Sequence, residues 1–269
     1  MTYTIDDLLY LMARLREPGT GCPWDLKQSY KTIAPSTLEE AYEVVDTIER
    51  EDYDHLREEL GDLLFQVIFY SQLGKEEARF DFPTIVDGLV SKLVRRHPHV
   101  FPDGTLESRI GDRDASQDEG NQDEVKARWE AIKQQERAEK GVKGVLDDVP
   151  VTLPALSRAA KLQKRASGVG FDWPEVSGPI AKVREELAEL EAAIEQGDHS
   201  AQQEELGDLL FAAANIARHL KVDPEAALRG ANRKFERRFR YVERQAGDQL
   251  GSASLTQLDR LWGQAKQQE

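Results

Sequence analysis

Apolar residues recur at every third or fourth position through most of the chain, which is the period of an α-helix. In 54–73 the apolar stripe consists of Leu56, Leu60, Leu63, Leu64, Val67 and Ile68. A later stripe consists of Leu206, Leu209, Leu210, Ala213, Ala214 and Ala217. We expect each helix to pack through its stripe. No long alternating run of β-branched residues competes with this pattern, so the predicted fold class is all-α.

The same period predicts a helix before each of these two. The apolar positions are Leu38, Tyr42, Val45 and Ile48 in the earlier helix and Val183, Leu187, Leu190 and Ile194 in the later one. Further helices are predicted over 83–96, 123–139, 154–166, 223–246 and 255–268.

Two stretches interrupt the helical pattern. The first, `PDGTLESRIGDRDASQDEGNQD` at 102–123, is polar, acidic and rich in turn formers, and it predicts a mobile loop. The second, `KGVKGVLDDVPVTLP`, carries the Gly and Pro residues typical of a domain boundary. We therefore predict an N-terminal unit at 1–139, a linker at 140–153 and a C-terminal unit at 154–269.

The two halves of the chain repeat the same motifs in the same order. The octapeptide `EELGDLLF` occurs at 58–65 and again at 204–211. Around it, `GCPWD` corresponds to `GFDWP`, `LEEAYE` to `REELAE`, `SKLVRR` to `RKFERR` and `RWEAIK` to `LWGQAK`. Such a long period excludes a solenoid of short repeats and indicates a tandem duplication of a unit of about four helices. Trp24 and Trp173, which align, are interpreted as anchors at the start of each unit.

Composition excludes several classes of function. The 269 residues carry a net charge of −14, which argues against binding to nucleic acids or to membrane surfaces. No run of about 18 apolar residues predicts a membrane span. The first residues, `MTYTIDDLLY`, predict no secretory signal, and the lone Cys22 cannot form an intramolecular disulfide. We therefore expect a cytoplasmic protein.

The acidic residues of the repeat are placed to converge. At about 100° per residue, Glu39 and Glu43 share a helix face, with Glu40 beside them. Glu59 and Asp62 share a face of the following helix. Both sets border the apolar stripes, so antiparallel packing of the two helices would bring the carboxylates to one edge of the interface. The same construction applies in the second copy to Glu185, Glu186, Glu189, Glu205 and Asp208.

A solvated acidic face is the competing interpretation, because the chain has 50 acidic residues. A metal site is favoured because the acids border the stripe and recur in both copies. Carboxylates about 4 Å apart repel by roughly 1–4 kcal/mol per pair, and a cation removes that repulsion. All-oxygen ligands without His or Cys suit Mg²⁺, with Mn²⁺ as the alternative ion. The short motif `HPH` at 97–99 is instead interpreted as a packed or capping element.

Together these motifs resemble the MazG family of nucleoside triphosphate pyrophosphohydrolases. The resemblance extends over nearly the entire chain, and the doubled `EExxE…ExxD` arrangement is its most specific part. It implies tandem four-helix all-α NTP pyrophosphatase units that are completed by homodimerisation. It also implies Mg²⁺-dependent hydrolysis of a nucleoside triphosphate to the monophosphate and pyrophosphate.

The candidate site residues follow from the pattern and the resemblance together. The candidate catalytic residues are Glu185, Glu186, Glu189, Glu205 and Asp208. The candidate metal ligands are Glu186, Glu189, Glu205 and Asp208 in the second unit and Glu39, Glu40, Glu43, Glu59 and Asp62 in the first. The candidate nucleotide-binding residues are Lys182, Glu185, Asn232, Lys234, Arg238, Trp262, Lys266 and Lys133, the last of which would reach the second unit's site.

The two copies differ at two positions that bear on nucleotide binding. Ser36 stands where the second copy has Lys182, and Val90 stands where it has Asn232. Loss of a cation and of a polar contact weakens binding of a triphosphate without removing the metal ligands. We therefore expect the C-terminal unit to hold the main catalytic site. The N-terminal unit would be weaker, selective for other nucleotides, or chiefly a module for dimerisation and regulation.

Three functions are consistent with these features. The leading one is a broad-specificity NTP pyrophosphohydrolase that clears the nucleotide pool. The second is a narrower activity on the same scaffold, such as dUTP, dCTP or phosphoribosyl-ATP pyrophosphohydrolysis. The third is a non-catalytic helical dimer that binds a regulatory partner. The sequence contains no `GxxxxGK[ST]` loop, which excludes a P-loop NTPase.

Overall fold

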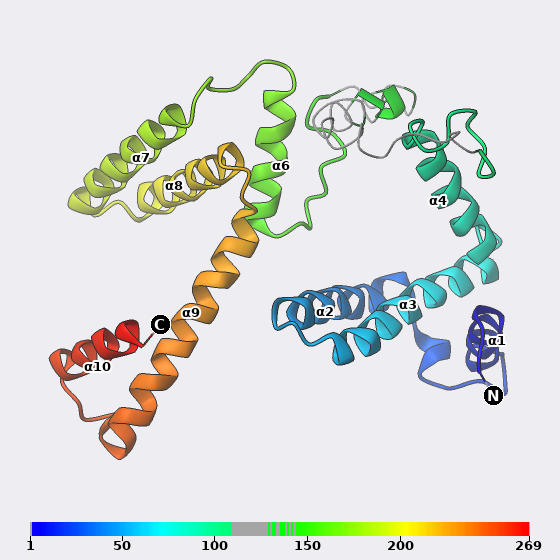
Figure 1. Ribbon diagram of the computed structural model, residues 1–269, viewed down its shortest axis with the longest axis horizontal. Coiled ribbons are helices and arrows are strands. Elements are labelled where there is room, and N and C mark those ends of the chain that lie inside the picture. The colour runs from blue at the N-terminus through cyan, green and yellow to red at the C-terminus, as the bar shows by residue number, and fades with distance from the viewer. Residues whose placement is uncertain are drawn as a thin grey trace, which may run out of the picture. The chain divides into compact units, whose positions relative to one another are not determined.

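The computed structural model describes residues 2–108 and 144–268, together with 129, 131–132, 135–137, 139 and 141. Every regular element in this part of the chain is a helix, which confirms the all-α prediction (Figure 1). The chain divides into two compact units, Met1–Ile132 and Lys133–Glu269. The linker predicted at 140–153 lies inside the second of these stretches.

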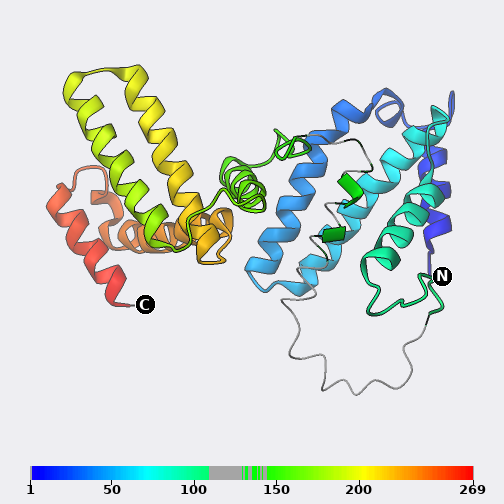
Figure 2. The ribbon, with the colours of Figure 1, turned by 90° about the horizontal axis from the view of Figure 1, so that it is seen from above.

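The first unit is built around a helical hairpin. Its elements are α1 (Ile5–Leu15), a short 3₁₀ helix η1 (Asp25–Lys27), α2 (Tyr30–Glu49), α3 (Tyr53–Glu76) and α4 (Phe82–Arg96). Helices α2 and α3 pack against each other along the hairpin, and α1 packs on α3 (Figures 1 and 2). The buried core of this unit consists of Met12, Ile33, Ile68, Phe69 and Leu73.

The second unit contains a corresponding hairpin. Its elements are α6 (Ala155–Ser167), α7 (Ser177–Gln196), α8 (His199–His219), α9 (Pro224–Ala246), η3 (Gly247–Gln249) and α10 (Leu255–Gln267). Helices α7 and α8 lie side by side, α6 packs on α8, and α10 packs on α9 (Figures 1 and 2). Small side chains such as Ala193, Ala212 and Ala214 are buried here and let the helices approach closely.

Both hairpins have a turn and an N-cap at equivalent positions. Asp52 caps α3 through the amide N–H of His55, and its counterpart Asp198 caps α8 through those of Ser200 and Ala201. One residue earlier, the backbone is left-handed in both copies, at Glu51 (φ +57°) and at Gly197 (φ +70°). Because the turn and the cap occupy equivalent positions, the octapeptide begins at the same point of each second helix.

The apolar stripes of the two octapeptide helices are only partly buried in this chain. Ile68 is fully buried, but Leu60 and Leu64 are 49% and 39% exposed. Their counterparts Leu206 and Leu210 are 48% and 51% exposed. The helices that pack on α3 and α8 cover only part of each circumference, so the octapeptide leucines lie on an uncovered face.

Most of the predicted helices are present. Those at 83–96, 154–166, 223–246 and 255–268 appear as α4, α6, α9 and α10, with ends that differ by one or two residues. Of the helix predicted over 123–139, the residues that the structure describes are helical. Residues 109–123 of the predicted loop lie outside the described residues. Helix α1 was not predicted, although the reciprocal hydrogen bonds between Thr4 and Asp7 cap it.

His97 confirms the capping interpretation of the `HPH` motif, because it is the C-cap of α4 and its Nδ1 lies 2.6 Å from the Leu93 carbonyl oxygen. None of the helices in the described part of the chain is both long enough and apolar enough to cross a membrane.

Candidate metal and nucleotide site

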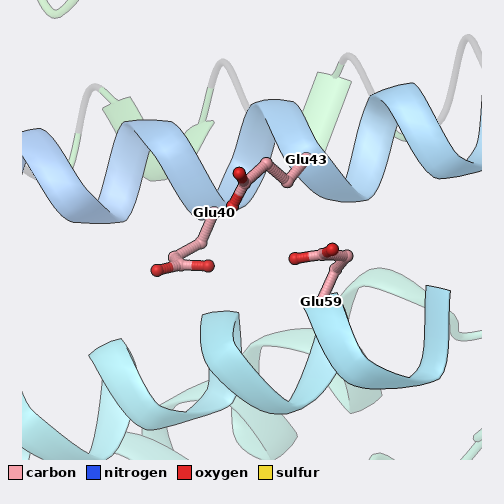
Figure 3. A group of neighbouring side chains, drawn as sticks. All are labelled: Glu40, Glu43 and Glu59. Atoms are coloured by element: carbon pink, nitrogen blue, oxygen red, sulfur yellow. The ribbon is translucent and has the colours of Figure 1, made fainter. Parts of the chain in front are cut away.

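The first hairpin brings three of its five predicted acids together. Glu40 and Glu43 on α2 and Glu59 on α3 each offer a carboxylate oxygen, and these oxygens lie within 4.8 Å of one another. Figure 3 shows Glu40 and Glu59 projecting into the space between the two helices, with the Glu43 side chain drawn across α2 near Glu40. Glu39 and Asp62 are outside this group. Both are nevertheless near it, because their charges act on Glu40.

This first cluster is electrostatically strained. Desolvation raises the pKa of Glu40, and the negative charges of Asp62, Glu43, Glu59 and Glu39 raise it further. These four neighbouring charges all have the same sign as the ionised Glu40 carboxylate. Such a group is stabilised either by a proton or by a bound cation.

The second hairpin forms the equivalent cluster from Glu186 on α7 and from Glu205 and Asp208 on α8. Their carboxylate oxygens also lie within 4.8 Å of one another. Glu186 is almost fully buried, with 3% of its surface exposed. Desolvation raises the pKa of Glu205, and the charges of Glu189 and Glu186 act in the same direction.

Lys182 distinguishes the second cluster from the first. Its Nζ lies 2.6 Å from Glu186 and 2.8 Å from Glu185. The hydrogen bond from Lys182 holds the pKa of Glu186 below its usual value despite burial. In return, Glu185 and Glu186 raise the pKa of Lys182. The ammonium group of Lys182 therefore lies against the buried carboxylate of Glu186, one helical turn away.

The remaining two predicted acids of the second copy surround this cluster. Glu185 pairs with Lys182 and its side chain is 56% exposed. Desolvation raises the pKa of Glu189, and a hydrogen bond with Glu186 adds to that rise. Glu189 therefore contacts the cluster through Glu186, whereas Glu185 is directed to the lysine.

A cavity of about 470 Å³ adjoins the second cluster and is partly lined by Lys182, Glu186 and Asp208. Apolar and aromatic side chains form much of the remaining wall, among them Leu162, Ala166, Phe171, Trp173 and Phe211. A pocket of this size and lining is typical of sites for small organic ligands.

Trp173 is both an anchor and a wall of this cavity. Its ring lies so close to Gly178 that a Cβ there would be 2.3 Å from it, which explains the glycine at the start of α7. The residue is 43% exposed and lines the cavity. The interpretation of Trp173 as an anchor alone was therefore too narrow.

Four polar residues of the cavity were absent from the sequence-based set: Gln163, Asp172, Asn215 and Arg218. Arg218 donates to Asn215 Oδ1 at 2.8 Å and also pairs with Asp172. The available signal was `AAANIARH`, in which Asn215 interrupts an otherwise small and apolar helix face.

The predicted nucleotide-binding residues of α9 and α10 lie elsewhere in the second unit. Arg238 stacks over the Trp262 ring at 5.8 Å, and Phe235 packs against the same ring at 5.3 Å. Asn232, Lys234 and Lys266 are exposed on this helix pair. Among the described residues, none from α9 or α10 lines the cavity. Lys133 lies outside the described residues.

Fold and site together define a class of protein: an all-α chain with two carboxylate clusters, each of which could hold a metal ion. The chain matches the MazG nucleotide pyrophosphohydrolase domain twice, at 28–101 and at 178–242. The chain belongs to the MazG nucleotide pyrophosphohydrolase family, as the resemblance implied, and is therefore an enzyme.

Two relatives that match over almost their whole length have names that agree with this assignment. The chain is 51% identical over 270 residues to the nucleoside triphosphate pyrophosphohydrolase of Escherichia coli (strain K12), with 98% of each chain covered. It is 39% identical over 264 residues to the Thermotoga maritima nucleoside triphosphate pyrophosphohydrolase/pyrophosphatase MazG, covering 97% of this chain and 95% of that one. It is also 44% identical over 265 residues to the uncharacterized protein YabN of Bacillus subtilis, covering 96% of this chain and 51% of YabN.

The double match confirms the tandem arrangement of two all-α units that the repeated octapeptide predicted. Membership of a hydrolase family also excludes the third functional alternative, a non-catalytic helical dimer.

Proposed function

We propose that the enzyme hydrolyses nucleoside triphosphates to the monophosphate and pyrophosphate, with broad base specificity, and so clears the cytoplasmic nucleotide pool. The observation that carries this proposal is the Glu186–Glu205–Asp208 cluster beside the cavity of about 470 Å³. Carboxylates suit the metal–phosphate end of such a substrate, and the apolar walls suit its organic end. The names of the two full-length relatives from Escherichia coli and Thermotoga maritima support the same reaction.

The donors of each cluster fit a hard divalent cation, because all are carboxylate oxygens and they converge within 4.8 Å. We propose Mg²⁺, with Mn²⁺ as the alternative, held by Glu186, Glu205 and Asp208 in the second unit and by Glu40, Glu43 and Glu59 in the first. Glu189, Glu39 and Asp62 would support these ligands at the edge of each cluster. A bound divalent cation would activate the attacking water and neutralise charge on the phosphates.

In the proposed reaction, water adds to the α-phosphorus while the bond from that phosphorus to the bridging oxygen of the β-phosphate breaks. The carboxylates hold negative charge in a partly desolvated site, so they cannot receive a triphosphate without compensating cations. Lys182 lies at the cavity wall and keeps Glu186 ionised for ligand binding. Its ammonium group would then meet a phosphate oxygen.

The second unit is proposed as the main catalytic site. Lys182 supports this assignment because Ser36 occupies its place in the first unit and carries no charge. The additional cations on α9 and α10, Lys234, Arg238 and Lys266, would contact phosphates in an assembled homodimer, with Asn232 and Trp262 beside them. Lys133 is proposed to serve the same site.

A homodimer is supported by the uncovered octapeptide leucines. Leu60, Leu64, Leu206 and Leu210 are all at least 39% exposed, and association of two copies would bury such residues. Sedimentation of the full chain at micromolar concentration should give twice the monomer mass. A monomer across that range would contradict this part of the proposal.

The test of function is a nucleotide panel assayed for monophosphate and pyrophosphate with Mg²⁺, using wild type, Glu186→Gln and Glu40→Gln. We expect Glu186→Gln to lower kcat/KM by about 10²–10³-fold, because it removes a buried ligand and leaves the fold of α7 intact. Glu191→Gln is the matched control on an exposed position of the same helix. Activity should vanish with EDTA.

Each alternative has a distinct outcome in this panel. If Glu40→Gln lost all activity and Glu186→Gln kept wild-type activity, the main catalytic site would be in the first unit. Release of inorganic phosphate instead of pyrophosphate would refute the reaction. Turnover confined to dUTP, dCTP or phosphoribosyl-ATP would identify the narrower activity.

A further inference from the structure

The polar groups of the cavity in the second unit have fixed orientations. Arg218 Nε lies 2.8 Å from Asn215 Oδ1, and an arginine can only donate hydrogen bonds. The amide of Asn215 must therefore present its oxygen to Arg218. Arg218 is itself held by Asp172, which also contacts His219. This leaves the Nδ2 group of Asn215, and its two N–H donors, for another partner.

Asn215 is a mostly buried residue, with 6% exposed, and the hydrogen bond that the structure gives its side chain is the one from Arg218 to its oxygen. Because Asn215 lines the cavity, a ligand there is the natural acceptor.

Gln163 offers the cavity a hydrogen-bond acceptor, where Asn215 offers donors. Its Nε2 donates to the Phe211 carbonyl oxygen at 2.8 Å, which fixes this amide too, because a carbonyl only accepts. Its Oε1 is buried and has no partner in the part of the chain that the structure describes. Gln163 is 9% exposed and also lines the cavity. The cavity is thus lined by one residue with spare donors and one with a spare acceptor.

The first unit lacks this arrangement. Counting along the octapeptide helices, Phe69 occupies the place of Asn215, Gln72 that of Arg218 and Gln66 that of Ala212. Phe69 is fully buried in the apolar core and packs edge-to-face on Phe65. The polar cavity residues therefore belong to the second unit, the one with Lys182.

We propose that this cavity binds the nucleobase, and that Asn215 and Gln163 are specificity-determining residues that contact its polar edge. The proposal rests on the proposed function, since the acids take the phosphate end of the substrate and leave the adjoining aromatic-walled space for the ring. Each nucleobase carries an acceptor and a donor on its edge, which match the amide nitrogen of Asn215 and the amide oxygen of Gln163. Phe171, Trp173 and Phe211 supply the apolar surface that a flat heterocycle covers.

The test compares the full-length wild type with Asn215→Leu and Gln163→Met, which keep side-chain size and remove the amide. We expect each variant to raise KM for nucleoside triphosphates by about 5–50-fold, to change kcat little, and to alter the ranking of bases. The inhibition constant of inorganic triphosphate, which carries no base, should stay unchanged. Gln203→Leu is the control, because it makes a similar change on an exposed face of α8.

Two outcomes would overturn the proposal. An unchanged KM and base ranking in both variants would show that neither amide contacts the base. If the variants weakened the binding of inorganic triphosphate or of ribose 5-phosphate as much as that of nucleoside triphosphates, the cavity would bind the phosphates or the sugar instead.

Failure of the proposed function is separable from failure of this inference. If wild type releases no pyrophosphate, calorimetry with AMP, CMP, GMP and UMP still measures base binding without turnover. Weaker monophosphate binding by Asn215→Leu than by Gln203→Leu would support the base site even then, and equal binding would refute it.

Discussion

At the scale of single residues, Glu40 and Glu186 occupy equivalent places and experience opposite surroundings. Other carboxylates raise the pKa of Glu40, whereas Lys182 lowers the pKa of Glu186. A raised pKa means that folding disfavours the ionised form, and a lowered pKa means that folding favours it. The same substitution at the two positions should therefore change stability in opposite directions.

We predict that, in EDTA at pH 7, Glu40→Gln raises the melting temperature and Glu186→Gln lowers it, each by about 1–3 °C. The first change removes repulsion from like charges, and the second removes the partner of Lys182. Differential scanning calorimetry measures both, with Glu191→Gln as the neutral reference. Shifts of the same sign would refute this account of the two clusters.

Asp172 gives the clearest pH dependence. Hydrogen bonding to Arg218 lowers its pKa, and His219 acts in the same direction. A carboxyl group with a depressed folded-state pKa stabilises the protein above its unfolded pKa, and that stability is lost as the pH falls through the folded value. Asp172→Asn should therefore melt below wild type at pH 7.

The difference between Asp172→Asn and wild type should shrink as the pH is lowered through and below 3.8, the ordinary value for an aspartate. Melting curves of both proteins between pH 7 and the lowest pH at which wild type stays folded measure it. A gap that widens on acidification would contradict the assigned ion pair.

The residue scale is also where prediction from sequence was most uneven. The acids could be located because helical periodicity alone places Glu40, Glu43 and Glu59 near the helix interface. Asn215 and Arg218 could not be assigned, because their role depends on Asp172, a loop residue 46 positions from Arg218. Periodicity carries no information about such contacts between a loop and a helix.

At the scale of elements, the hairpin turns show how the two copies reach the same geometry with different residues. Glu51 and Gly197 both have positive φ. A side chain in the left-handed region is destabilised by roughly 1 kcal/mol relative to glycine. The copies therefore differ in turn stability although their caps, Asp52 and Asp198, are the same.

We predict that Gly197→Ala lowers stability by about 1 kcal/mol and that Glu51→Gly raises it by about 0.5–1 kcal/mol. Space is not limiting for the first change, since no atom lies within 4 Å of a Cβ at Gly197. Urea unfolding of the full chain measures both. Stabilisation by Gly197→Ala would show that its backbone conformation is not the constraint.

Element positions were largely predictable and the buried faces were not. The 3.6-residue period determines where helices α4, α6, α9 and α10 run. It does not determine which part of an apolar stripe is covered within the chain, and Leu60 and Leu206 of the predicted stripes are about half exposed. Which face of a helix is buried depends on the elements that pack against it. For these two leucines, we propose that a second copy of the chain supplies that packing.

At the scale of the whole molecule, duplication gives two carboxylate clusters with unequal charge. The first combines Glu40, Glu43 and Glu59 in a field of further carboxylates. The second includes the same number of acids in its central group, but Lys182 pairs with Glu186. A metal ion should bind more tightly where no lysine competes for the carboxylates. The first unit should therefore bind the metal more tightly, although the second is proposed as the main catalytic unit.

We predict that calorimetry of the full chain with Mn²⁺, without nucleotide, resolves a tighter site in the first unit and a weaker site in the second. Glu40→Gln should remove the tighter site and Glu186→Gln the weaker one, while the double variant should bind at neither. Adding a non-hydrolysable nucleoside triphosphate should strengthen the site that needs Glu186, because the phosphates add ligands and engage Lys182. If Glu186→Gln removed the tighter site instead, Lys182 would not be competing with the metal, and the contrast drawn between the two units would be wrong.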